Sequence, residues 1–136
     1  MEKIRKAGAL IFYAQKMLIV KPRGKPFYIN PGGKYEIKEG REETAAECLA
    51  RELEEELNVQ LGKYVFYNTY EVEKAAHSNI PLSLDLFLVE HSGEIIPSGE
   101  IESVEWMSRQ DFLGKKYNLA PSFNIFVEDL MRDDFL

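Results

Sequence analysis

Three glutamates within one short stretch carry the side chains best suited to chemistry. Glu52, Glu55 and Glu56 stand at positions i, i+3 and i+4, so on an α-helix their carboxylates share one face. Like charges at this spacing repel and weaken an isolated helix by about 0.2–0.5 kcal/mol per pair. A divalent cation reverses that effect, because Mg²⁺ prefers hard oxygen ligands. Taken alone, however, such a triplet is more often just a solvated helix face.

The residues around these glutamates predict the helix that would position them. Apolar side chains recur at three- and four-residue steps, about a quarter turn from the carboxylates, which is typical of one buried helix face. These apolar residues are Ala46, Leu49, Ala50, Leu53 and Leu57. Thr44 offers a hydroxyl to cap the first turn. The sequence therefore predicts an amphipathic helix within 43–59 that carries an acidic face beside its apolar face.

A longer motif of fixed residue types extends on both sides of the three glutamates. The pattern Glu43-x7-Arg51-Glu52-Leu53-x-Glu55-Glu56-x-Asn58-Val59 resembles the second half of the Nudix box, G-x5-E-x7-R-E-U-x-E-E-x-G-U, where U is aliphatic. The segment Pro31-Gly32-Gly33-Lys34 lies where the leading glycines of the box belong. The pattern from Gly93 through Glu100 and Glu102 to Trp106 is similar to the second half of many small Nudix proteins. The chain thus resembles a Nudix hydrolase over most of residues 7–130.

Two departures from the box accompany the match. Nine residues separate Gly33 from Glu43, where the box has five, so four residues within 37–41 look inserted. Counting from Glu39 restores the first gap but lengthens the second, so it only moves the insertion. Glu43 is kept as the box glutamate because Glu43-Thr44 is similar to the usual Glu-Thr/Ser helix entry. Asn58 replaces the last glycine, and Asn tolerates the left-handed conformation of a helix end better than other non-glycine residues.

Length and composition limit the classes of protein. A chain of 136 residues with 45% hydrophobic residues fits one globular domain, expected over residues 1–136. A net charge of −6 argues against long nucleic acid as a partner, although metal ions can bridge a polyphosphate to an acidic site. We find no apolar run of membrane-spanning length and no signal peptide. The lone Cys48 fits a reducing cytoplasm and is expected to be a buried, inert thiol.

The order of elements predicts an α/β fold. Strands are expected over 7–13, 17–20, 27–29, 64–72, 82–89 and 101–107, and helices at 43–59, at 109–113 and from Pro121 onward. Turns are expected at 14–16 and 91–94, and a connecting loop with His77 at 73–81. Strands before and after the first helix favour a mixed sheet covered by helices on two faces. The Nudix resemblance implies the same α/β/α sandwich with a central mixed sheet.

The resemblance also implies roles for the box residues. Glu52 and Glu56 become metal ligands, and Glu55 becomes a further ligand or orients metal-bound water. Arg51 is similar to the box arginine that pairs with the first glutamate, here Glu43; a surface salt bridge is the plainer reading. Gly33 matches the box glycine that often offers a backbone carbonyl to the metal. The implied cofactor is Mg²⁺, for which Mn²⁺ can substitute.

The general base and the substrate contacts are less well defined by the sequence. A box glutamate or a later one can serve as base, so Glu100 and Glu102 are candidates, although both could be simple loop charges; Glu36 is a weaker one. Candidate substrate contacts are Arg23, Phe27, Gly32, Gly33 and Lys34. Glycines there allow close approach of the backbone to a ligand, and the cationic and aromatic side chains suit phosphates and bases, although exposed loop residues would look the same. His77 and His91 are taken as solvated.

The expected function is Mg²⁺-dependent hydrolysis of a nucleoside diphosphate linked to another group. A nucleoside triphosphate or modified nucleotide is the first choice of substrate, and ADP-ribose or a sugar nucleotide is the second. A catalytically silent Nudix-fold nucleotide sensor is the alternative from another class, and an unrelated α+β domain is the blandest one. We expect a cytoplasmic monomer or homodimer without membrane partners.

Overall fold

The computed structural model describes residues 3–73 and 80–136. Most of the loop expected at 73–81, including His77, lies outside these residues. The elements in chain order are β1 (Ile4–Leu10), β2 (Phe12–Tyr13), β3 (Lys16–Pro22), β4 (Gly32–Lys34), β5 (Ile37–Lys38), β6 (Arg41–Glu42), α1 (Ala45–Leu57), β7 (Gln60–Val72), β8 (Leu82–Ser92), β9 (Ile101–Met107), α2 (Arg109–Leu113) and α3 (Phe123–Arg132).

Four strands form a mixed sheet in the order β4-β1-β8-β7. β1 and β8 run parallel, with Ile4 opposite Leu82 and Leu10 opposite Leu88, whereas β4 and β7 pair antiparallel with their neighbours. A second sheet has the order β2-β3-β9. The expected turn between β2 and β3 is confirmed: Ala14 and Gln15 both have positive φ, as a two-residue hairpin connection requires.

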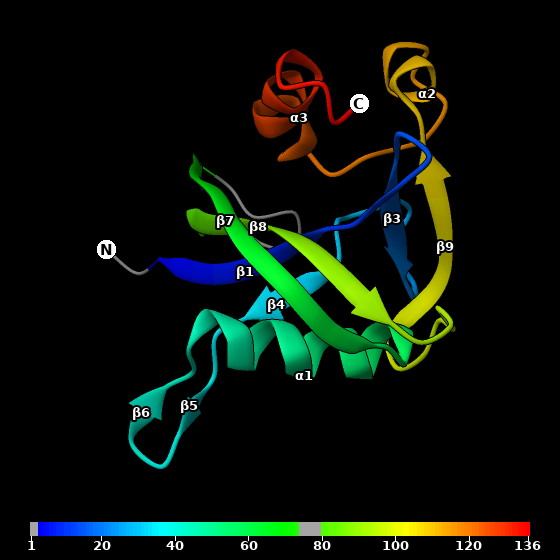
Figure 1. Cartoon of the computed structure of the whole chain (residues 1–136). Helices are drawn as coiled ribbons and strands as arrows, with labels where there is room; N and C mark the ends of the chain where they lie inside the picture. The colour runs from blue at the N-terminus through cyan, green and yellow to red at the C-terminus, as the bar shows by residue number, and fades with distance from the viewer. Residues whose placement is uncertain (1–2, 74–79) are drawn as a thin grey trace.

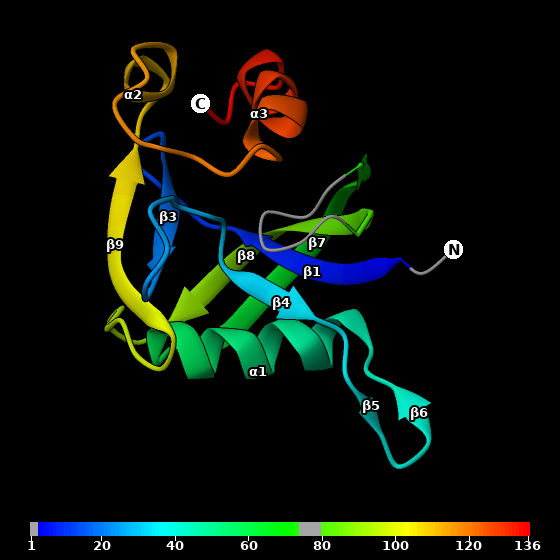
Figure 2. The same cartoon turned by 180° about the vertical axis from the view of Figure 1, so that it is seen from behind.

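Helices cover the two faces of the mixed sheet (Figures 1 and 2). One core cluster packs Leu49, Leu53 and Leu57 of α1 against the sheet, and a separate cluster contains the buried residues of α3, with Phe123 and Phe126 among them. This arrangement confirms the expected α/β/α sandwich with a central mixed sheet. No helix in the described ranges is long and apolar enough to cross a membrane.

Local signals explain where α1 begins and ends. The Thr44 hydroxyl accepts from the Glu47 N–H while the Glu47 carboxylate accepts from the Thr44 N–H, which is a complete capping box. At the other end Asn58 adopts the left-handed conformation with φ of 57°. The predicted buried face needs one correction, because Ala50 is exposed and Cys48 is buried in its place.

The four extra residues of the box loop form a hairpin of their own. β5 and β6 pair antiparallel, and Glu39 and Gly40 form the turn with positive φ. The hairpin projects away from the sheet beyond the start of α1 (Figure 1). At its base the Glu43 N–H donates to the Glu36 carbonyl at 2.8 Å. The insertion is therefore closed at its base by a backbone hydrogen bond.

Several strands and helices begin or end at residues other than those predicted. β7 begins at Gln60 and β8 continues to Ser92, so the turn expected at 91–94 starts later and His91 lies in a strand, where it is partly rather than fully exposed. The strand expected at 27–29 is reduced to isolated bridges of Tyr28 and Ile29. The last helix begins at Phe123, after Pro121. β7 and β8 continue beyond their apolar runs because their additional residues pair with one another, Gln60 opposite Ser92 and Leu61 opposite His91.

Leu53→Ala tests the contribution of α1 to the core. Leu53 is fully buried, so we expect the substitution to lower the free energy of unfolding by about 2–5 kcal/mol. Denaturant unfolding measures the change, with the exposed neighbour Glu54→Ala as control, expected within about 0.5 kcal/mol of the parent protein. Equal effects of the two variants would contradict the packing of α1 described above.

Candidate active site

The carboxylates of α1 meet the short edge strand β4. The Gly32 N–H donates to Glu56 Oε1 at 3.1 Å. A Cβ atom added to Gly33 would lie 2.5–2.7 Å from the carboxylate atoms of Glu52, so no side chain fits there without moving Glu52. Two acidic side chains of α1 therefore lie directly against the backbone of β4, Glu52 because Gly33 has no side chain and Glu56 through the Gly32 N–H.

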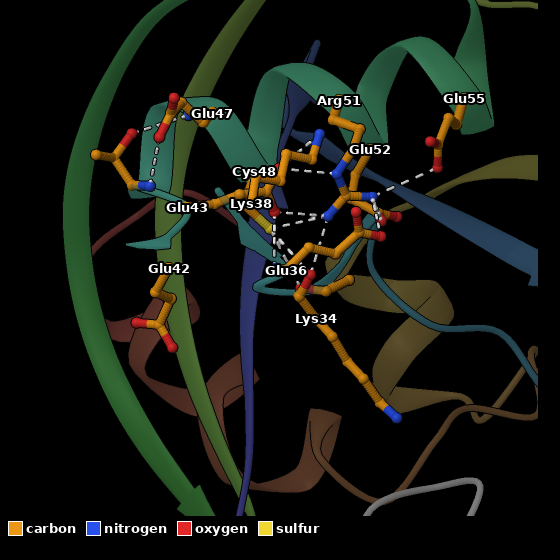
Figure 3. Close-up of polar contacts among 12 residues, drawn as sticks. Lys34, Glu36, Lys38, Glu42, Glu43, Glu47, Cys48, Arg51, Glu52 and Glu55 are labelled. Carbon is orange, nitrogen blue, oxygen red and sulfur yellow. Dashed lines mark hydrogen bonds and ion pairs between the residues drawn. The ribbon is translucent and has the colours of Figure 1, made fainter. Parts of the chain in front are cut away.

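Arg51 joins α1 to the loop that follows β4 (Figure 3). Its Nε donates to Glu43 Oε2 at 2.9 Å and its Nη2 to Glu43 Oε1 at 2.8 Å, a bidentate pair. The same guanidinium reaches Glu52 Oε1 at 2.5 Å and the Lys34 carbonyl at 3.0 Å. It also lies 3.3 Å from a carboxylate oxygen of Glu36. The predicted Arg51–Glu43 pair is thus present, and it lies inside a larger network rather than alone on the surface.

Glu43 is the buried member of this network. Its side chain is 2% exposed, and its Oε1 also accepts from the Glu36 N–H at 2.9 Å. Hydrogen bonding from Arg51 holds the pKa of Glu43 at about 2, below its ordinary value of 4.5. The carboxylate therefore stays charged in the folded protein, fixed in place by the guanidinium.

Glu56 and Glu52 are shifted in the opposite direction. Burial and then the charge of Glu52 raise the pKa of Glu56 well above its usual range. Burial also raises the pKa of Glu52, although hydrogen bonding from Arg51 opposes the shift. Two carboxylates that resist ionisation side by side form a site where a bound cation would relieve their repulsion.

A cleft of about 290 Å³ opens beside these carboxylates. Glu52 and Glu56 line it together with a third and a fourth acidic residue, Glu36 and Glu100. The remaining lining residues are Lys6, Pro22, Ile29, Gly32, Gly33, Lys34 and Ile101. The cleft is therefore lined by carboxylates on the side of α1 and by the lysine side chains Lys6 and Lys34 on the side of β1 and β4.

The structure brings only part of the predicted site residues to this cleft. Glu52, Glu56, Glu100 and the Gly32–Lys34 strand line it. Glu55 is 60% exposed and lies 3.5 Å from Arg51. The other predicted residues lie elsewhere: Glu102 pairs with Lys21, Arg23 donates to the Gly99 carbonyl, and Phe27 packs against the core cluster on the α3 side. The roles of all the predicted site residues, those that line the cleft included, stay predictions.

The donor set suits a hard divalent cation only in part. Glu52 and Glu56 provide two carboxylates in one cleft, and the absence of a Cβ at Gly33 lets the Glu52 carboxylate lie directly against the β4 backbone. Among residues 3–73 and 80–136, no group of three or more acidic, histidine or cysteine side chains has converged for metal binding. The residues fit such an ion in charge and donor type, and Glu52 and Glu56 would hold it.

The Gly33 carbonyl lies close to Cys48 of α1. The buried Cys48 Sγ lies 3.5 Å from that oxygen and from the Lys34 carbonyl. Burial raises the pKa of the Cys48 thiol to about 11, so it stays protonated at neutral pH. The thiol is therefore a packing group beneath β4, in line with the inert role expected from the sequence.

Sequence reasoning missed Lys6. It stands on β1 opposite Lys34 of β4, and both line the cleft. No local motif marks it, because its position depends on the pairing of β1 with β4 across more than twenty residues. Only a correct register for that pair could have found it.

Comparisons with known proteins agree with this geometry. The family model of the NUDIX domain matches residues 2–130. A search of curated proteins finds no match. Among solved structures, the ORF135 protein of E. coli is 27% identical with a TM-score of 0.71, and the match covers 97% of this chain and 91% of that one.

Two further structures share the fold at lower identity. The mutator MutT protein of Bacillus halodurans is 20% identical with a TM-score of 0.70, and the match covers 92% of this chain and 80% of that one. A bifunctional NMN adenylyltransferase/ADP-ribose pyrophosphatase of Francisella tularensis, in complex with AMP and a Mn ion, is 19% identical with a TM-score of 0.67. That match covers 98% of this chain and 42% of the bifunctional protein.

Glu43→Gln tests the buried ion pair through its pH dependence. A carboxylate with a depressed pKa contributes stability above its ordinary pKa and loses it as the pH falls through the folded-state value. We therefore expect the variant to lose about 2 kcal/mol of unfolding free energy at pH 7, with the difference disappearing between pH 4.5 and about 2. Denaturant unfolding across that range measures it. Parallel pH profiles of variant and parent would contradict the assignment.

Gly33→Ala tests the close approach of β4 to Glu52. The added methyl group must displace a flexible carboxylate, so we expect little change in stability but a loss of hydrolytic activity of about tenfold or more. Gly40→Ala is the matched control: its φ of 75° makes alanine unfavourable by about 1 kcal/mol, yet nothing lies within 4 Å of the added atom. Unchanged activity in Gly33→Ala would show that the position of Glu52 is unimportant.

Proposed function

Because the chain belongs to the Nudix family and is a Nudix hydrolase, we propose that it cleaves a pyrophosphate bond in a nucleoside diphosphate linked to another group. A nucleoside triphosphate or a modified nucleotide is the first choice of substrate. We further propose that residues 1–136 form one Nudix hydrolase domain that acts in the cytoplasm as a monomer or homodimer, without membrane or long nucleic-acid partners.

One observation carries the proposal. Glu52 and Glu56, spaced as in the box, lie together in a cleft against the glycines of β4. A solvated helix face would leave both side chains in water, whereas Glu52 is only 14% exposed and Glu56 accepts from a backbone N–H. Burying two like charges without a binding role is unfavourable, so their arrangement favours a cation site.

Each box residue has a task in this proposal. Glu52 and Glu56 hold Mg²⁺, or Mn²⁺ in its place, with Glu55 and the Gly33 carbonyl as further candidates. When bound, the ion supplies charge neutralisation at the phosphates and orients the attacking water. Arg51 holds Glu52 in position and fixes the loop through Glu43. Lys34 and the Gly32–Gly33 backbone lie where they can contact the phosphate chain.

Glu100 is our choice of general base. It lines the cleft together with Glu52 and Glu56, whereas Glu102 is engaged with Lys21 at 3.1 Å. A base must lie within hydrogen-bonding reach of the water whose proton it takes, and a residue that lines the cleft satisfies this more easily. Glu36 also lines the cleft, but its carboxylate lies 3.3 Å from the Arg51 guanidinium.

Two alternatives keep some support. An ADP-ribose or sugar-nucleotide substrate is favoured by the Francisella tularensis neighbour, named as an ADP-ribose pyrophosphatase. The altered spacing between Gly33 and Glu43 is the one feature of the sequence that favours a silent nucleotide sensor. The β5–β6 hairpin accounts for the extra residues while Glu43 still meets Arg51, so that support is weakened.

A nucleotide panel assayed with Mg²⁺ and with Mn²⁺ tests the function. We expect turnover of at least one substrate, loss of activity when the metal is chelated, and a decrease on the order of 10²–10³ in Glu56→Gln. Glu54→Gln is the matched control, because Glu54 is exposed on the same helix. Binding of nucleotides without turnover of any would favour the sensor, and full activity in Glu56→Gln would contradict the metal assignment.

A further inference from the structure

We propose that Lys6 binds a substrate phosphate, namely the one that stays on the nucleoside after hydrolysis. The inference rests on the proposed function and adds to it a residue outside the box. It comes from the position of Lys6 between two cavities and from its lack of a partner.

Lys6 lies where the acidic cleft meets a second, smaller cavity. It stands on β1 opposite Leu84 of β8, on the same face of the strand as the buried Leu10 and therefore on the face toward α3. The second cavity, of about 40 Å³, shares Lys6, Ile29, Gly32 and Gly33 with the cleft. Its other lining residues are Ala7, Asn30, Val72, Leu82, Leu84, Ala120 and Ser122. The two cavities are thus neighbours, with Lys6 in the lining of both.

The Lys6 ammonium has no protein partner in the described residues. No carboxylate there lies within ion-pair distance of it, although the charges of Glu56 and Glu52 act on it from the cleft. By contrast, Lys21 and Lys38 each form an ion pair. Lys6 is half-buried, and burial lowers its pKa, as expected of an ammonium that has lost water without gaining a partner. Such a group suits an anionic ligand.

The two cavities differ in the polarity of their lining residues, and this difference indicates which substrate phosphate Lys6 binds. The cleft carries the carboxylates expected to hold the cation, so the reacting pyrophosphate bond belongs there. The second cavity is mostly apolar and includes only Asn30 and Ser122 as neutral polar residues. At about 40 Å³ it admits the edge of the uncharged part of a substrate rather than a whole nucleoside. A phosphate at the junction is bonded to that uncharged part, and Lys6 is the cation found at this junction. The other product of hydrolysis, which lacks the uncharged part, would gain little binding affinity from Lys6.

Equilibrium binding separates this role from turnover. AMP, GMP, CMP and UMP are titrated calorimetrically in saturating Mg²⁺ into the parent protein and into Lys6→Met, Lys6→Arg and Lys16→Met, with inorganic pyrophosphate as a second ligand. Lys16→Met is the matched control, because Lys16 is an exposed lysine on another strand. We expect Lys6→Met to weaken the tightest-binding monophosphate about tenfold or more and pyrophosphate much less. Lys6→Arg should recover most of the loss, and Lys16→Met should match the parent protein.

A separate Mg²⁺ titration excludes general damage to the site. Removing a cation near Glu52 and Glu56 should leave the Mg²⁺ dissociation constant unchanged or lower it, whereas misfolding would raise it. Equal monophosphate binding in Lys6→Met and the parent protein overturns the inference, as does equal weakening of both ligands or no binding of any monophosphate to the parent protein. Failure of the nucleotide panel would reject the hydrolase proposal instead, because these titrations require no turnover.

Discussion

The bidentate pair between Arg51 and Glu43 is the interaction on which the site depends. It joins the middle of α1 to the loop that leaves β4, and the same guanidinium contacts Glu52 and the Lys34 carbonyl. Removing one partner from a buried pair leaves the other charge without compensation, which is far more unfavourable than losing a surface salt bridge. The position of β4 against α1, and hence of the cleft, therefore depends on a charge pair that performs no chemistry itself.

The cleft concentrates charge that folding alone would disfavour. Glu52 lies against the strand because Gly33 carries no side chain, Glu56 accepts from the Gly32 N–H, and the burial of both carboxylates opposes their ionisation. Packing elsewhere supports this arrangement: Leu49 and Leu53 on the neighbouring face of α1 are fully buried against the sheet. One helix thus presents an apolar face that packs against the sheet and an acidic face that Arg51 and the Gly32 N–H hold in place.

The structural features that the sequence predicted are those that depend on residues close together along the chain. The α1 helix, its Thr44 cap and the convergence of Glu52 with Glu56 follow from local spacing. Pairings between distant segments could not be read in this way. They include the parallel register of β1 with β8 and the pairing of Lys21 with Glu102, which separates Glu102 from Glu100. The exposure of Ala50 likewise depends on how α1 packs against the sheet.

The β5–β6 hairpin has a consequence for how this chain can vary. Because the Glu43 N–H and the Glu36 carbonyl close the loop at its base, residues between them can be added or removed without moving Arg51 or its partners. Homologous chains can therefore differ in length here and keep the same chemistry. For protein engineering, the exposed tip at Glu39–Gly40 is a natural place to graft a peptide tag or fuse a reporter.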